Sequence, residues 1–90
     1  DTLVSKITVN DSISITVTGH TDNTGTSESN QELSMRRAFT VAGYIRDKKP
    51  GSNITTITGM GESIPAADNS TVAGRRKNRR VEIVIYHLSR

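Results

Sequence analysis

Alternation of apolar and polar residues marks the strands of this chain. In residues 13–18, isoleucine and valine at the odd positions alternate with serine and threonine, which predicts a strand with one buried face. Residues 54–58 alternate less regularly and predict a second strand. Residues 81–86 form the most apolar segment and predict a third strand, placed centrally in the sheet.

Between the first two strands the pattern changes to the period of a helix. Ser29 followed three residues later by Glu32 is a capping-box pattern, which places the helix start near Asn30. Pro50 and Gly51 prevent its continuation. One apolar stripe, predicted to pack on the sheet, contains Leu33, Ala38, Val41, Ala42 and Ile45.

The remaining segments complete a two-layer α/β arrangement. Residues 1–8 have apolar side chains at helical spacing and predict the end of a helix. Residues 59–78 predict a long loop with a helical turn near 71–76. The order strand, helix, strand favours a parallel pair with a right-handed crossover, and therefore an α/β sandwich of two layers.

Composition limits the classes of protein. Ninety residues suit one domain. Cysteine is absent, so the chain has neither disulfides nor thiolate metal ligands. There is no apolar run of about 18 residues to span a membrane, and no signal peptide. If the protein is exported, we expect these residues to be a fragment of a longer precursor.

The charge pattern leaves two interpretations of the basic run at residues 75–80. The formal net charge is +3 at pH 7, and this run is either a patch for a polyanion or a solvated loop before a strand. Because no aromatic residues are interleaved with it, we favour the loop. Asn78, Arg79 and Arg80 are expected to order that loop, with Arg79 near the candidate site.

The polar loop at residues 19–25 is the candidate site. It follows the first strand and leads into the helix, where α/β folds commonly bind ligands, and Asp22 is its only charged residue. Arg37 lies about two turns into the helix, but helical side chains lean toward the N-terminus. The two side chains therefore suit a ligand with both an ammonium and a carboxylate. The alternative is that Asp22 caps the turn and Arg37 forms a surface ion pair with it.

Three motifs resemble one known family. The segments GHTDNTG (19–25), NQELSMRRA (30–38) and GRRKNRRVEI (74–83) resemble the signature of the C-terminal domains of the outer-membrane protein A (OmpA) type, over residues 13–86. The resemblance implies a mixed sheet with helices on one face. It also implies that a strand and part of the first helix lie upstream, so that residues 1–90 are one domain of a longer envelope protein.

The resemblance also implies a function. Domains of this family bind the stem peptide of peptidoglycan through diaminopimelate, non-covalently and without a cofactor, and anchor a larger protein to the wall at the periplasmic face of a Gram-negative-type envelope. Membrane contact would come only from parts outside this fragment, and other envelope proteins are further expected partners. By position in the motifs, the binding pair falls on Asp22 and Arg37. Supporting roles fall on Thr21, Asn30, Leu33 and Arg79.

The sequence is also compatible with other functions. The same fold would serve as a protein-interaction module with an occluded pocket, whose specificity comes from residues 60–78. A nucleic-acid-binding domain would use residues 75–80. An enzyme is least favoured, because no activated nucleophile or carboxylate pair converges on the loop. His20 as a metal ligand or base lacks a third member, so a structural role is expected.

Overall fold

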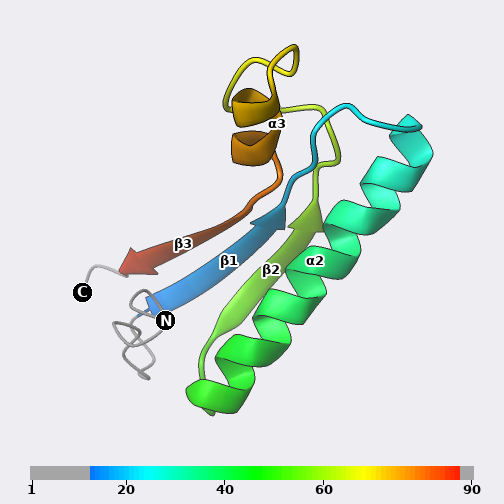
Figure 1. Cartoon of the computed structure of the whole chain (residues 1–90). Coiled ribbons are helices and arrows are strands. Elements are labelled where there is room, and N and C mark those ends of the chain that lie inside the picture. The colour runs from blue at the N-terminus through cyan, green and yellow to red at the C-terminus, as the bar shows by residue number, and fades with distance from the viewer. Residues whose placement is uncertain (1–12, 88–90) are drawn as a thin grey trace.

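The computed structural model describes residues 13–87 (Figure 1). The expected helical segment over residues 1–8 lies outside this range. The elements in chain order are β1 (Ile13–Gly19), α2 (Ser27–Lys48), β2 (Ile54–Gly59), α3 (Val72–Asn78) and β3 (Val81–His87). All three strand predictions are therefore confirmed, and the helical turn expected near residues 71–76 is α3.

The described strands form one mixed sheet in the order β2-β1-β3. β1 is parallel to β2, as the strand-helix-strand order predicted, and antiparallel to β3. The predicted central position of β3 is wrong for this sheet, because β1 lies between the other two strands. The apolar residues of β3 lie on both of its faces. Ile83 and Ile85 pack on the core, while Val84 and Tyr86 at the alternate positions are exposed.

α2 covers one face of the sheet, and α3 lies at the end of the sheet where β1 and β2 stop (Figure 1). The core is made by the buried apolar side chains Ile13, Ile15, Val17, Ala38, Ala42 and Ile45. The predicted helical stripe is thus confirmed, with Leu33 and Val41 half-buried at its margin. The opposite face of β1 carries Ser14, Thr16 and Thr18, which are only half-buried. The α/β sandwich of two layers is confirmed.

The start of α2 differs from the prediction. Thr26 is the N-cap, with an extended backbone and an Oγ1 that accepts a hydrogen bond from the Ser29 amide at 3.1 Å. The helix therefore begins at Ser27, and the capping box expected from Ser29 and Glu32 is wrong. Glu32 instead faces Arg36 one turn later, at 3.7 Å. Thr26 and Ser29 are both residues that commonly cap helices. Thr26 forms the cap because the backbone changes from extended to helical at that residue.

Glycines allow α2 to approach the strand ends closely. A Cβ at Gly19 would overlap the carbonyl oxygen of Ser34, and a Cβ at Gly59 would lie 2.5 Å from the amide nitrogen of Met35. Ser34 itself is fully buried, and its Oγ accepts a hydrogen bond from the Gly61 amide at 2.9 Å. The N-terminal half of α2 therefore lies directly against the loops that follow β1 and β2.

Candidate functional site

Backbone hydrogen bonds bring three loops together at this end of the sheet. The amide of His20 donates to the carbonyl of Arg80 at 2.8 Å, and the amide of Thr21 donates to the carbonyl of Gly61 at 2.9 Å. Thr21 is buried, and its hydroxyl donates to the carbonyl of Asp22. The loop after β1 is thus held between the loop after β2 and the segment that enters β3.

Asp22 is a fixed, ionised carboxylate. The residue is 6% exposed. Its Oδ1 accepts the Thr24 amide at 2.9 Å, and its Oδ2 accepts a hydrogen bond from Nη1 of Arg79 at 2.7 Å. The pKa of Asp22 is lowered, first by the Thr24 amide and then by Arg79, against the opposing effect of burial. The carboxylate therefore stays negative at neutral pH.

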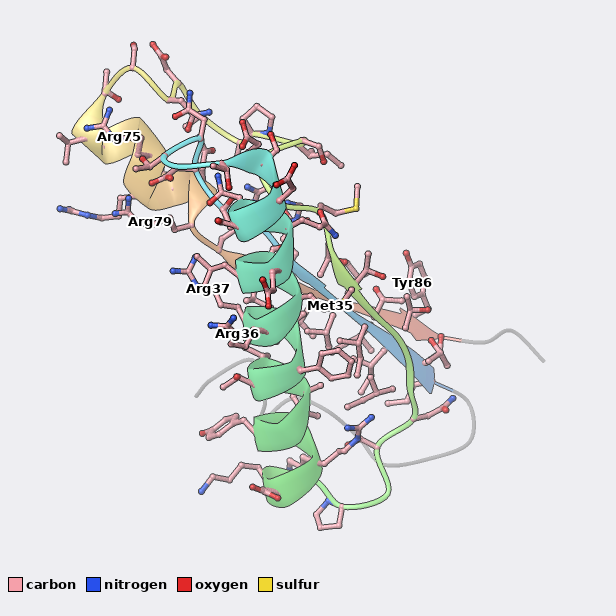
Figure 2. The ribbon with its side chains drawn as sticks, turned by 90° about the vertical axis from the view of Figure 1, so that its right-hand side faces the viewer. Met35, Arg36, Arg37, Arg75, Arg79 and Tyr86 are labelled. Carbon is pink, nitrogen blue, oxygen red and sulfur yellow. The ribbon has the colours of Figure 1, made fainter. Side chains whose placement is uncertain are left out.

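The shared ligand pocket expected from Asp22 and Arg37 stays a prediction, and the two side chains are not bonded directly to each other within residues 13–87. Arg79 takes the place beside the carboxylate. Nη1 of Arg37 is instead buried, and no residue in the range 13–87 forms a hydrogen bond with it. Figure 2 shows Arg37 leaving α2 on the side where α3 and Arg79 lie. The surface ion pair considered from the sequence is therefore wrong, and Arg37 offers an unsatisfied donor.

Asn30 connects the Asp22 loop to Glu62, a residue outside the three sequence motifs. Its side chain is buried, and its Nδ2 donates to the carbonyl of Asp22 at 3.3 Å and to Oε1 of Glu62 at 3.1 Å. Leu33, one turn further along α2, is half-buried. No spacing rule indicates Glu62, because it is an isolated carboxylate in a glycine-containing loop.

His20 is buried beside Glu82 of β3 and Arg80, which directly precedes that strand. Its Nε2 lies 3.4 Å from Oε1 of Glu82, but neither ring nitrogen makes a hydrogen bond within residues 13–87. Burial lowers the pKa of His20, the nearby Arg80 lowers it further, and Glu82 opposes both. The imidazole is therefore neutral at pH 7. In the part of the chain that the structure describes, no three His, Cys, Asp or Glu side chains gather as a metal site would need.

The basic run around α3 is largely engaged by the protein itself. Nη1 of Arg75 donates to the carbonyl of Asn69, and Arg79 binds Asp22. Arg80 donates to Glu82 at 2.9 Å and to the carbonyl of Ile64 at 3.0 Å. Three of the five basic side chains of the run thus hold the long loop, while Arg76 and Lys77 are exposed.

Asn78 orders the same loop from inside. The residue is fully buried, and its Oδ1 accepts the amides of Ala66 and Ala67 at 2.7 and 2.9 Å. Its Nδ2 donates to the carbonyl of Ala67 and to Oδ1 of Asn69. These bonds confirm the prediction that this segment orders the loop. Arg79 is the next residue in the chain, so its backbone begins at a position that the bonds of Asn78 hold in place.

A surface groove lies apart from this site. It runs along the exposed face of α2 between Ser27 and Phe39, with Met35 and Phe39 as its apolar part, and Met35 is labelled on α2 in Figure 2. None of the expected site residues lines it. Within residues 13–87, no helix is both long enough and apolar enough to cross a bilayer.

Comparison with known proteins identifies relatives of this chain. It is 52% identical over 68 residues to the outer-membrane lipoprotein YfiB of Pseudomonas aeruginosa, which covers 74% of this chain and 40% of that protein. It is 47% identical over 72 residues to the peptidoglycan-binding protein ArfA of Mycobacterium tuberculosis, which covers 79% of this chain and 22% of that protein. The chain therefore spans less than half the length of either relative.

Solved structures and a family model agree with these matches. The cell wall anchor of the T6SS from Pseudomonas aeruginosa superposes with a TM-score of 0.70 and 33% identity, over 84% of this chain and 55% of that one. The model of the OmpA family matches residues 1–79. This chain belongs to the OmpA family.

Proposed function

We infer that this domain binds peptidoglycan non-covalently, through the diaminopimelate of the stem peptide, and so anchors a larger envelope protein to the cell wall. The names of its relatives support the general class, since they include a peptidoglycan-binding protein and a cell wall anchor. The observation that carries the finer proposal is the buried Nη1 of Arg37, on the helix that follows the Asp22 loop, which has no hydrogen-bond partner among the described residues 13–87.

The charges of the site suit a zwitterionic ligand. Asp22 provides a fixed anion for an ammonium group, and its bonds to Thr24 and Arg79 hold it in one orientation. A ligand carboxylate bound by Arg37 would satisfy the donor that residues 13–87 leave unpaired, once a change of side-chain rotamer brings the buried Nη1 to the surface. A buried donor without a partner typically costs about 1–3 kcal/mol, so this contact favours binding. The free stereocentre of diaminopimelate carries both required groups.

Selectivity among stem peptides follows from the same donor. A lysine-type stem keeps the ammonium but lacks the carboxylate, so it would leave Nη1 of Arg37 unsatisfied. A site built around a polar partner strongly rejects an analogue that lacks it. We therefore expect clear preference for the diaminopimelate stem.

The location of the protein follows from its relatives. Proteins similar to this chain are named as outer-membrane lipoproteins and porins, which supports the periplasmic face of the envelope as the working location of this domain. Two other relatives are named for peptidoglycan binding and for wall anchoring, and not for a reaction. Other envelope proteins are further partners in this role.

The test is a titration of the folded domain with a soluble diaminopimelate stem peptide, followed by amide chemical shifts. We expect saturable shifts in residues 19–25 and 30–38. Asp22→Ala and Arg37→Ala should each weaken binding about tenfold or more, because each removes a charge-assisted contact.

Arg36→Ala is the matched control for charge and helix position. Arg36 adjoins Arg37 on α2, but its guanidinium is exposed and faces Glu32, so its loss should leave the affinity within about twofold. Equal affinity for lysine-type and diaminopimelate stems would remove Arg37 from the proposed role. A well-folded wild-type domain that shows no shifts would refute wall binding and favour a protein partner.

A further inference from the structure

We propose that Glu62 is a positioning residue of this binding site, which fixes the side-chain amide of Asn30 so that its carbonyl oxygen is presented to the ligand. This proposal rests on the proposed function, because it assigns a role in binding the same ligand. Glu62 lies in the loop after β2, three residues beyond the end of that strand at Gly59, and none of the motifs of the sequence includes it.

Glu62 holds Asn30 by a specific contact across the site. Asn30 Nδ2 lies 3.1 Å from Glu62 Oε1 and 3.3 Å from the Asp22 carbonyl. Ser27, in the first turn of α2, adds a weaker hydroxyl contact to the same Oε1 at 3.4 Å. The two acceptors around Nδ2 belong to separate loops, so the amide is oriented from both sides.

This orientation determines which atom of Asn30 remains available. A carboxylate only accepts hydrogen bonds, and so does a backbone carbonyl, so both partners require the NH2 side of the amide. Oδ1 of Asn30 receives no hydrogen bond from any residue in the described range. Its carbonyl oxygen therefore adds a neutral acceptor beside the Asp22 loop, to which the Nδ2 of the same amide is bonded, and such an acceptor suits an ammonium group.

Removal of Glu62 would release this constraint. Asn30 is only 4% exposed, so its amide would keep one partner, the Asp22 carbonyl, and would lose its second acceptor. An amide held by a single weaker bond at 3.3 Å rotates more readily and presents either end to the ligand. Because the lost bond orients Asn30 and does not itself contact the ligand, we expect an effect on affinity no larger than that of one ordinary hydrogen bond, about five- to tenfold.

A double-mutant cycle with the diaminopimelate stem peptide tests this role. Glu62→Ala should weaken binding about five- to tenfold in the wild-type background, but by less than about twofold when Asn30→Ala is already present. Glu62→Gln keeps an acceptor oxygen and should restore most of the affinity. Glu28→Ala is the matched control. It removes an exposed carboxylate from the first turn of α2, the turn that also contains Ser27 and Asn30.

A second readout needs no ligand. The side-chain NH2 signals of Asn30 in the free domain should shift and broaden in Glu62→Ala, while Glu62→Gln should leave them near their wild-type positions. Unchanged signals in Glu62→Ala, or a full effect of Glu62→Ala in the Asn30→Ala background, would overturn the proposal. If the wild-type domain fails to bind, the proposed function falls and the binding role of Glu62 with it, whereas the NH2 signals still report whether the contact exists.

Discussion

Nη1 of Arg79 lies 2.7 Å from Oδ2 of Asp22 and joins two residues that are 57 positions apart in the chain. The partners differ in exposure, since the side chain of Asp22 is 8% exposed and that of Arg79 is 40% exposed. The pair therefore links the loop after β1 to the end of α3 with its anionic member inside the protein. Loss of the cation would leave a desolvated carboxylate with only the Thr24 amide.

Arg79→Ala should lower the free energy of unfolding by about 1–2 kcal/mol, between the values typical of exposed and of buried ion pairs. Chemical denaturation at pH 7 measures this loss. Arg76→Ala is the control, because Arg76 is an exposed cation of α3, the helix that ends directly before Arg79, and its removal should change stability by less than about 0.5 kcal/mol. Equal effects of both variants would mean that the pair contributes little.

Gly19→Ala should destabilise the domain by about 2 kcal/mol or more, because its Cβ would overlap backbone atoms of Ser34 rather than a movable side chain. Gly43→Ala is the contrasting variant. It lies in α2 with no heavy atom near the added Cβ, so alanine should stabilise the helix by about 0.5–1 kcal/mol. Thermal or chemical unfolding gives both values, and a stable Gly19→Ala protein would contradict the close approach of α2.

His20 should make stability fall on mild acidification. Its pKa in the folded state is lowered by burial and by Arg80, so the unfolded chain binds a proton first. This contribution to stability is complete above the unfolded pKa of about 6.5 and is lost as the pH falls toward the lower folded value, with a slope of at most about 1.4 kcal/mol per pH unit. The free energy of unfolding measured from pH 7.5 to 5 checks this.

His20→Gln should give a flatter pH profile over that range. A direct check is the imidazole titration by NMR, in which His20 should titrate below 6.5 in the folded domain. A folded pKa above 6.5 would show that Glu82, 3.4 Å from Nε2, prevails over burial.

The sequence by itself determined the elements and the composition of the site loop. The alternation over residues 13–18 and the stripe from Leu33 to Ile45 are local properties that each segment carries alone, so strand β1 and helix α2 were predictable. The motifs that contain Asp22 and Arg79 could also be found in the sequence, because each is an unbroken run of residues. The helix start was missed because Thr26 and Ser29 offer overlapping cap signals.

Only the tertiary structure decided which side chains meet. The position of β1 between β2 and β3, and the close approach of α2 at Gly19, place Arg79 rather than Arg37 against Asp22. The same packing brings Glu62 to Asn30, 32 positions away in the chain. Periodicity describes which face of an element is apolar, but it carries no information about distances between elements. Those distances come from strand order and backbone packing, so the pairing within the site could not be derived from the sequence alone.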